Sequence, residues 1–598
     1  MTAPATVRRT TCKSRSSRPL VSAPALGRAL VCAVGIAGFV GPTVAEGATS
    51  AWVQYQADVP KTIIELQPFR RAASVEFPVQ GEATLTNLNP YINSWFLLTI
   101  RWPQSGKSES YHLENPSPRT QFLSIDAEHL NGIRIADGGR EIECDLWNGG
   151  STTTLQQAQR SDLPYAPLCE DRLYLRNEVS GTYTHLERVT NFLRDHVWGG
   201  EQIVGFVKQE FFADAFIEKG GAAAALPLEP ATTAGLRAAQ IGDAFDRQAV
   251  VPEGLEIDVG QKASGLLLGR WYAARDVAGV YVSVIKPQAI VTPLSAAERR
   301  SVNELDSVEA GALDYLVAFD LQQLDLGFAL GTDHPRVGWS ERVLDSVRDP
   351  RLPGPDGIGS PSPLVVNGMV NPPTVERAAA TFAGGFKREH GAFRYGALAL
   401  QNHGSHYGFI QEGTVFSKLQ PQLATLLVYD DDTVAMKTWT AVEDGLLAHI
   451  RYARQNGVPL IEYDEKAGVS TAGALVNSWG PGNWSGSSEE HLRTVRSGVC
   501  LVATSTARFL VYGYFSTATP SAMARVFQAY GCRYAMHLDM NALEHTYLAL
   551  YAHRNGRIVV EHLIDGMAEV DRKGGDELAP RFLSFPDDRD FFYLTEKR

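Results

Sequence analysis

The chain has 598 residues, of which 44% are hydrophobic and 20% are charged, and its formal net charge is −12. This length exceeds what a single core usually supports, and the composition excludes both wholesale disorder and a membrane bundle. So acidic a chain is also a poor generic partner for nucleic acid, whose binding depends on Lys and Arg.

The N-terminal segment has the features of an export signal. Six basic residues precede or border an apolar run from Ala29 to Val40, and Thr43-Val44-Ala45 offers small side chains for cleavage. The run is shorter than the roughly 20 apolar residues that span a bilayer, and no later segment has a transmembrane pattern. Cleavage after Ala45 takes the formal net charge from −12 to −18 by removing six positive charges. We therefore expect residues 1–45 to be a signal peptide and the protein to be secreted or periplasmic, with an uncleaved anchor as the alternative.

Removal of this signal leaves four cysteines, Cys144, Cys169, Cys500 and Cys532. An even number in an oxidising compartment favours two disulfides, for which three connectivities exist. We predict the pairs Cys144–Cys169 and Cys500–Cys532, because each pair is local in the chain and closes a loop of moderate length. Buried free thiols are the alternative.

The pattern along the chain predicts a multi-domain protein of the α+β class. Residues 46–165 contain short alternating runs, such as Ser94–Trp102, between Asn, Pro and Gly clusters, which is typical of a β-sandwich-like module. Residues 166–300 form a mixed α/β module of unknown role. Residues 301–598 are expected to form a C-terminal α+β domain, interrupted by a proline-rich surface excursion at 349–363.

The middle module mixes several kinds of predicted element. Helices are expected over residues 184–197 and 205–218, followed by an Ala- and Pro-rich linker over 220–233. Residues 276–285 alternate and are rich in β-branched side chains, so they predict a strand.

The first candidate for chemistry is a turn with two adjacent glycines, Gly384 and Gly385. Without Cβ atoms these residues let the backbone approach another group closely, while Lys387, Arg388 and His390 add positive charge and a titratable ring. Backbone N–H groups and a cation of this kind can hold a phosphate. A hairpin with merely solvated charges is the alternative.

Two further motifs carry weaker signals. His403 and His406 stand three residues apart, but the surrounding glycines favour a loop over a helical metal site. Trp479 and Trp484 lie among turn residues, where an indole offers a flat apolar face to a sugar ring or simply anchors a loop.

The most informative segment ends in a group of acid–base residues. Residues 509–515 predict a buried strand, and Thr519 before Pro520 predicts a helix that runs to about Tyr530. A second strand over 533–539 then delivers Asp539, and Asn541, Glu544 and His545 follow at once. Two carboxylates and an imidazole within seven positions form an acid–base set suited to hydrolysis. A buried polar network that stabilises the sheet is the alternative.

These segments resemble, in their order along the chain, the phosphodiester glycosidase family, which includes the enzyme that removes N-acetylglucosamine from a phosphodiester on mannose. The resemblance covers roughly residues 365–550. Its elements are the turn in Thr381-Phe-Ala-Gly-Gly-Phe-Lys, the strand and turn Leu423–Trp439, an arginine before a strand, and the helix that leads into Leu538-Asp539. The family usually places three glycines and a serine or threonine after that aspartate. Here Met540-Asn-Ala-Leu stands instead, which marks a divergent branch.

The resemblance implies a secreted hydrolase that cleaves a sugar phosphodiester or a related glycosidic linkage in envelope or extracellular glycans. It implies that Asp539, Glu544 and His545 are catalytic, the aspartate or glutamate acting on the anomeric carbon or its attacking water and the histidine moving a proton. The expected substrate-binding residues are Gly384, Gly385, Lys387, His390, Arg493 or Arg496, Asn541, Trp479 and Trp484. No cofactor is expected, and the partner is a carbohydrate or glycosyl phosphate.

Two other interpretations stay open. A metal-dependent hydrolase would draw ligands from the histidines and carboxylates His390, His403, His406, His537, Asp539, Glu544 and His545, although no metalloprotease-type helical motif is present. A glycan- or cell-wall-binding protein would keep the scaffold without turnover, because fold similarity alone does not establish activity.

Overall fold

The computed structural model describes residues 61–77, 81–103, 105–148, 151–184, 187–189, 192, 214–223, 227–231, 235–260, 262–291, 298–333, 337–340, 343–348, 356–401, 403–404, 406–478, 491–504, 506–554, 557–574 and 577–597. The expected signal peptide lies outside these residues, as does most of the two helices predicted over 184–197 and 205–218. Residues 187–189 are helical. Within the described part of the chain, no helix has both the length and the apolar character needed to cross a bilayer.

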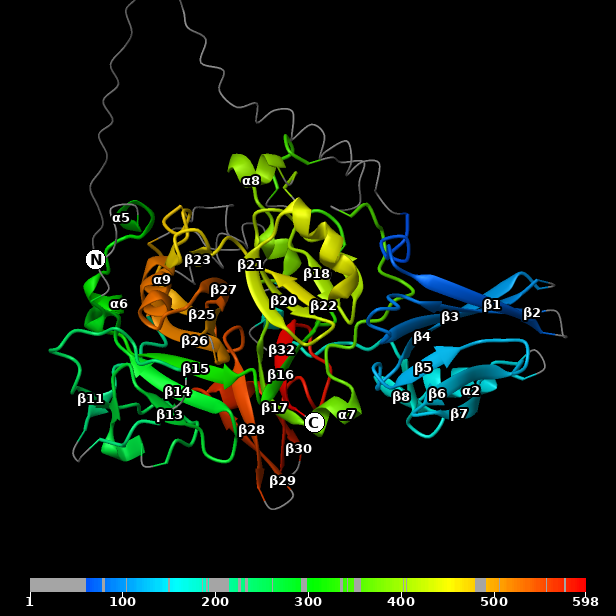
Figure 1. The fold of residues 1–598 in the computed structure, drawn as a ribbon, viewed down its shortest axis with the longest axis horizontal. Coiled ribbons are helices and arrows are strands. Elements are labelled where there is room, and N and C mark those ends of the chain that lie inside the picture. The colour runs from blue at the N-terminus through cyan, green and yellow to red at the C-terminus, as the bar shows by residue number, and fades with distance from the viewer. Residues whose placement is uncertain are drawn as a thin grey trace, which may run out of the picture. The chain divides into compact units, whose positions relative to one another are not determined.

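The chain is β-rich with few helices, in agreement with the coarse α+β class, and every pairing between described strands is antiparallel. Its first sheet has the order β1-β2-β3-β4-β9-β8, drawn in blue and cyan in Figure 1. A smaller sheet, β5-β6-β7, and helix α2 accompany it. The bounds are β1 Arg71–Phe77, β2 Gly81–Asn87, β3 Trp95–Trp102, β4 Lys107–Glu114, β5 Gln121–Ser124, β6 Gly132–Asp137, β7 Arg140–Asp145, α2 Thr153–Gln159, β8 Tyr165–Leu168 and β9 Leu173–Arg176.

The alternation of these strands gives the first sheets a core of their own. In β2 every second side chain is buried from Gly81 to Leu85. Leu98 of β3 and Ile133 of β6 belong to the same buried cluster. The opposite face of β3 packs against a later part of the chain, because the Trp95 ring makes an edge contact with Phe416 at a ring-centroid distance of 5.9 Å.

An eight-stranded sheet with the order β13-β14-β15-β26-β25-β27-β23-β24 forms the centre of the remaining chain. Its bounds are β13 Trp271–Ala273, β14 Val280–Ile285, β15 Asp314–Asp320, β23 Ile461–Asp464, β24 Val469–Ala472, β25 Thr494–Ala503, β26 Arg508–Ala518 and β27 Tyr534–Met540. The strands β15 and β27 are buried along their whole length, and β26 is buried after its first residue, which explains their nearly unbroken apolar sequences.

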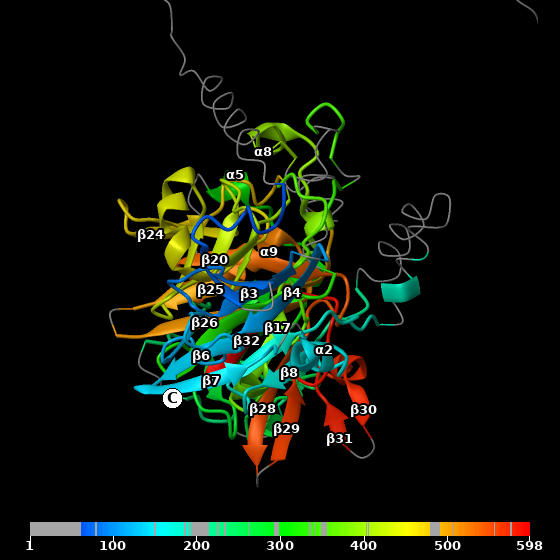
Figure 2. The ribbon, with the colours of Figure 1, turned by 90° about the vertical axis from the view of Figure 1, so that its right-hand side faces the viewer.

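A five-stranded sheet, β16-β32-β17-β28-β29, packs against the central sheet. Its bounds are β16 Leu324–Ala329, β17 Ala378–Ala383, β28 Leu548–Arg554, β29 Arg557–His562 and β32 Phe591–Glu596. Figure 2 shows β28 and β29 as a hairpin that continues this sheet. Phe382 of β17 links the layers, with its ring 6.2 Å from Phe319 of β15 and 5.2 Å from Tyr512 of β26.

The other described elements complete the scaffold. A second five-stranded sheet has the order β19-β18-β22-β20-β21. Its bounds, with those of the short strands and helices, are β10 Gly221–Ala222, β11 Ala249–Val251, β12 Leu266–Leu267, β18 Phe409–Gln411, β19 Thr414–Ser417, β20 Ala424–Tyr429, β21 Val434–Thr438, β22 Ile450–Gln455, β30 Arg572–Gly574, β31 Glu577–Ala579, α5 Glu298–Ser301, α6 Ser307–Gly311, α7 Pro372–Val375, α8 Gly396–Gln401 and α9 Pro520–Ala529.

Helix α9 and strand β27 follow the local sequence signals closely. Thr519 is the N-cap of α9 and accepts a hydrogen bond from the Ala522 backbone at 3.2 Å, with Pro520 at the first helical position. Gly531, at φ +74°, lies just beyond the helix end. Strand β27 then begins at Tyr534 and brings Asp539 close to its last residue.

Both predicted disulfides are formed. Cys144–Cys169 joins β7 to the segment before β9, and Cys500–Cys532 joins β25 to the segment between α9 and β27. The Cα atoms of the pairs are 5.6 Å and 5.8 Å apart, within the usual range. Two disulfides are typical of a protein that folds in an oxidising compartment.

The boundaries expected at residues 165 and 300 remain predictions, but strand pairing crosses both. Arg176 of β9 pairs with His112 of β4, so the first sheet includes residues beyond 165. Val280 of β14 pairs with Phe319 of β15, which joins the end of the middle module to the C-terminal sheets.

Candidate active site

A buried arginine connects the acid–base residues that follow β27. Arg589 donates from Nη1 to Asp539 Oδ2 at 2.8 Å and from Nη2 to His545 Nε2 at 2.7 Å. Its Nε donates to Glu187 Oε1, a residue 402 positions away in the sequence. The Arg589 side chain is only 7% exposed, so these bonds replace hydration that burial has removed. Arg589 is therefore the residue around which this site is organised.

The hydrogen bonds of His545 fix its protonation state. A guanidinium can only donate, so Nε2 of His545 accepts from Arg589. The carbonyl oxygen of Met540 can only accept, so Nδ1, 2.8 Å away, carries the ring proton. His545 is thus a neutral imidazole with both ring nitrogens in use, which suits a residue that orients Arg589.

The double-glycine turn lies against the end of β27. The Gly384 N–H donates to the Asp590 carbonyl at 2.8 Å, and a Cβ at Gly384 would lie 3.0 Å from the Asp590 carbonyl carbon. Gly385 has φ +124°, and a Cβ there would lie 3.3 Å from the Leu538 carbonyl oxygen. The side-chain amide of Asn456, which would also lie 3.3 Å from that Cβ, donates to the Leu538 carbonyl at 2.6 Å. Glycine is thus required for this turn to approach the strand that carries Asp539.

Lys387, which follows the turn, is held by two carboxylates. Its Nζ lies 3.0 Å from Asp333 Oδ2 and 3.0 Å from Asp588 Oδ2, and its side chain is 5% exposed. Burial alone would lower the pKa of Lys387, but Asp588 and Asp333 outweigh that effect and raise it, so the ammonium is charged. Burial raises the pKa of Asp588 to about 7, and the Lys387 ammonium offsets this only in part. This pair places a cation and a titratable acid beside the Arg589 cluster.

Glu187 and Glu544 differ in protonation because of their neighbours. Burial favours the neutral form of Glu187, but Arg589 and the neighbouring cations outweigh it and hold the pKa low, so Glu187 is ionised. Burial and the adjacent Glu187 charge raise the pKa of Glu544. The Thr184 hydroxyl also donates to Glu544 Oε1 at 3.2 Å. Glu544 is consequently the better proton donor of the two and Glu187 the fixed anion.

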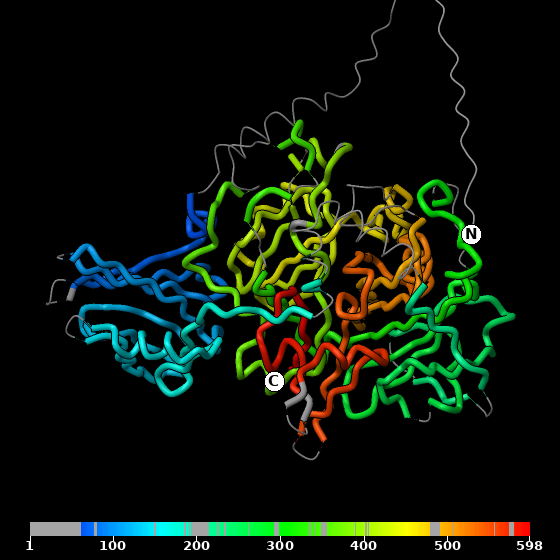
Figure 3. Tube along the Cα trace, turned by 180° about the vertical axis from the view of Figure 1, so that it is seen from behind, coloured from blue at the N-terminus to red at the C-terminus, as the bar shows by residue number. Residues whose placement is uncertain are grey.

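Two segments that the predicted motifs do not include position Glu544 and Glu187. They are the segment from Arg581 to Asp587 and the segment around Thr182. Arg581 donates to both oxygens of Asp587, at 2.7 Å and 2.9 Å, and to the Glu544 carbonyl at 2.7 Å. Thr182 forms a parallel bridge with Asp587, which brings the chain before Glu187 to the site. In Figure 3 the red C-terminal segment, which carries Arg589 into β32, runs beside the green segments of β16 and β17.

The structure places the predicted site residues in three groups. Gly384, Gly385, Lys387, Asp539, Glu544 and His545 belong to the cluster around Arg589 or border it. Asn541 lies next to it at φ +81°, and its N–H donates to the Val495 carbonyl at 2.9 Å. His390 lies in the 3-10 segment Arg388–Gly391 just after Lys387. Trp479 and Trp484 lie outside the described residues.

The two arginines predicted to bind phosphate have other partners. Arg493 forms ion pairs with Asp306 at 2.6 Å and Asp214 at 3.0 Å, and these carboxylates belong to another group. Arg496 is fully buried and donates to the carbonyls of Ala518 and Leu492. Burial lowers its pKa to about 9. In the described part of the chain the guanidinium beside Asp539 belongs to Arg589.

One feature of the sequence indicates the site residues that the motifs missed. Asp587-Asp588-Arg589-Asp590 is a run of four charges directly before the buried aromatic strand β32, and charges in such a position must be paired when the strand is buried. Glu187 has no comparable signal, because its role depends on a contact with a residue 402 positions away.

A metal would compete with Arg589 for its ligands. Three residues, Glu187, Glu544 and His545, each offer one possible ligand atom. These three atoms lie within 4.8 Å of one another, which is close enough to share an ion. However, Arg589 already uses His545 Nε2 and Glu187 Oε1, so a metal would have to displace a buried guanidinium. His406, another candidate ligand, accepts from the Ser340 N–H at 3.2 Å instead. The residues present therefore fit a metal poorly.

No protein-family model matches this chain, and no curated protein matches it. Among solved structures, it is similar to the crystal structure of a Burkholderia pseudomallei protein that is named only as one thought to be exported. The identity is 12%, the match covers 49% of this chain and 76% of the other, and the TM-score is 0.21. A similarity at this score carries no argument about fold or activity, so the interpretation depends on the site itself.

Proposed function

We propose that this protein is an exported hydrolase that cleaves a sugar phosphodiester at the Asp539 site. The observation that carries the proposal is the convergence of Asp539 and His545 on Arg589, with Glu544 Oε1 3.8 Å from His545 Nε2, beside Lys387 and the double-glycine turn. Acidic, basic and cationic groups with different protonation states are what hydrolysis of an anionic glycoside requires. The order of these elements along the chain also resembles the phosphodiester glycosidase family.

The protonation states suggest a division of labour. Asp539, ionised against Arg589, accepts the proton of a water whose oxygen bonds to the anomeric carbon. The bond between that carbon and the phosphate oxygen breaks, and its electron pair leaves with the phosphate. Glu544, with its raised pKa, supplies a proton to that departing oxygen. Lys387 stabilises the phosphate charge, and His545 holds Arg589 in place.

The direct test is Asp539→Asn, assayed on N-acetylglucosamine 1-phosphodiesters and related glycosyl phosphodiesters. We expect turnover to fall about 10²- to 10⁴-fold, the usual contribution of a general base or acid. Asp464→Asn, at the exposed last residue of β23, is the matched control and should retain full activity. Unaltered turnover in the Asp539 variant would remove this residue from the mechanism.

A metal-dependent hydrolase, the second candidate, would require an ion to displace Arg589 from Glu187 and His545, which with Glu544 lie close enough to share one. It predicts loss of activity with EDTA, recovery with zinc or calcium, and a stoichiometric metal in the purified protein. Polysaccharide binding without any product from the whole substrate set would instead favour a non-catalytic glycan-binding protein.

A further inference from the structure

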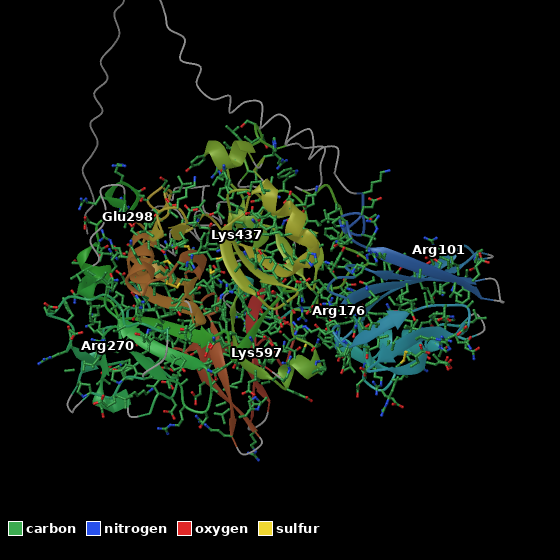
Figure 4. The ribbon with its side chains drawn as sticks, viewed as in Figure 1. Arg101, Arg176, Arg270, Glu298, Lys437 and Lys597 are labelled. Atoms are coloured by element: carbon green, nitrogen blue, oxygen red, sulfur yellow. A yellow bond between two sulfur atoms is a disulfide. The ribbon has the colours of Figure 1, made fainter. Side chains whose placement is uncertain are left out.

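A cavity lies at the end of the five-stranded sheet β16-β32-β17-β28-β29 that is opposite to the candidate active site. Its volume is about 730 Å³, and residues of β16, of β32 and of the segment before β17 border it. Asp325 near the start of β16, Arg377 before β17 and Lys597 after β32 line it. Figure 4 labels Lys597 at this end of the sheet. The first sheets supply part of the opposite wall through Ser94 and Glu114.

The same three strands lead to the candidate active site at their opposite ends. Gly384 follows β17, Asp590 precedes β32, and Asp333 follows β16. Each strand has six residues, which at about 3.3 Å per residue separates the two places by roughly 20 Å. A ligand in the cavity would therefore not touch Asp539 or Arg589.

The charged groups of the cavity form pairs across its wall. Arg451 donates to both oxygens of Glu412, at 2.8 Å and 3.2 Å, and Lys597 lies 3.6 Å from Asp325. Arg119 pairs with Asp432. With cations and anions balanced in this way, the cavity has little net charge to attract an ion of either sign. It offers instead many fixed donors and acceptors, which suits a neutral ligand rich in hydroxyl groups.

Tyr593 of β32 provides a flat surface in this wall. It pairs with Gly327 of β16, and a Cβ at Gly327 would lie 2.1 Å from the Tyr593 Cζ atom. The ring therefore lies directly over the glycine, and Tyr593 is also one of the residues that line the cavity. The Tyr593 hydroxyl bonds to that of Tyr452 at 2.9 Å, which fixes the orientation of the ring. An aromatic face beside planar polar groups is a favourable surface for a sugar ring.

We propose that this cavity binds an uncharged oligosaccharide, with a sugar ring stacked on Tyr593 and its hydroxyls bonded to the polar side chains that line the cavity. The cavity is distinct from the candidate active site, and the proposal holds whether or not Asp539 is catalytic. Replacing Gly327 would displace Tyr593, which explains why a glycine interrupts an otherwise side-chain-bearing strand.

The test is calorimetric titration of the full-length exported chain with neutral hexasaccharides of α-1,4-glucose, β-1,4-glucose and β-1,4-N-acetylglucosamine. We expect at least one to bind saturably below about 1 mM, a typical weak-site affinity. Tyr593→Ala should weaken that binding at least tenfold, whereas Tyr593→Phe, which keeps the ring, should change it less than threefold.

Two further variants separate binding from folding and from catalysis. Arg377→Ala alters the cavity wall outside the strand cores and should also weaken binding. An unchanged unfolding temperature would show that this variant still folds. Asp539→Asn should bind the hexasaccharide as wild type does, even if turnover is lost. Absence of saturable binding by all three sugars, or equal binding by Tyr593→Ala and wild type, would overturn the proposal.

Discussion

Two arginines of this chain each face three polar partners. One of these arginines, Arg589, belongs to the candidate active site, and the other, Arg134, belongs to the first module. Arg589 contacts Glu187, Asp539 and His545, and its side chain is 7% exposed. Arg134 lies 2.9 Å from Glu128 and within 4 Å of two other carboxylates, but Glu128 is 79% exposed. The number of partners is similar, and the difference in burial decides what each arginine does.

This difference separates a buried cluster of mutually dependent charges from a solvated surface group. Water screens the charges around Arg134 and replaces any partner that is lost. Around Arg589 no such replacement is at hand, because its carboxylate partners are at most 6% exposed. Each residue of that cluster therefore depends on the others, and the following substitutions test that dependence.

The largest effect is expected for Arg589→Met. This change leaves the ionised Glu187 and Asp539 buried without their cation, which costs about 3–5 kcal/mol of unfolding free energy. Turnover should be lost as well. Urea unfolding followed by fluorescence measures the stability, and a loss under about 1 kcal/mol would show that water reaches the cluster.

Removal of a disulfide is expected to have the next largest effect. Replacing Cys500 and Cys532 with Ala should cost about 2–5 kcal/mol, and the same change at Cys144 and Cys169 should cost a similar amount. The sequence separations of 32 and 25 residues predict a difference of only about 0.2 kcal/mol. A much larger loss for the Cys500 pair, by the same unfolding assay, would show that the active-site strands depend on it for more than chain entropy.

The raised pKa of Asp588 predicts that the free energy of unfolding changes with pH. Its pKa rises from an ordinary 3.8 to about 7 in the folded protein, so the folded state holds a proton that the unfolded chain releases. Its stabilising contribution is complete below about pH 4 and is lost as pH rises through about 7. Asp588→Asn should remove this decline, whereas Asp126→Asn, on the first module, should leave it intact. Parallel curves for wild type and Asp588→Asn from pH 4 to 8 would contradict the burial argument.

The smallest effect is expected for Arg134→Met. Its exposed ion pairs are screened and mobile, so thermal unfolding should match that of wild type within error. A clear fall in the unfolding temperature would mean that the surface pairs act as a network, and the contrast with Arg589 would then be weaker than we infer.

Local sequence signals were sufficient for several elements near the site. Thr519-Pro520 and Gly531 mark the two ends of α9, and the next apolar run is β27. The cysteine pairs were predictable because each is short in sequence and the number is even. These features depend on interactions between residues that are close in the chain, which a single sequence records well.

The partners of Asp539 could not be predicted in the same way. Arg496 was expected to precede a strand, but it lies within β25 and pairs with Met540, which points to the opposite face of β27 from Asp539. Arg589 lies 50 positions beyond Asp539, and Glu187 lies 402 positions before Arg589. Such contacts follow from how the sheets pack, and no local pattern records them.

The parallel bridge between Thr182 and Asp587 has a consequence for how the protein is made. A ribosome delivers Glu187 early and Arg589 some four hundred residues later, so the early segment must wait for its partner. A nascent chain that has not yet emerged past residue 590 lacks Arg589 and therefore cannot complete this cluster. The buried ion pairs of the cluster would thus form only at the final stage of synthesis.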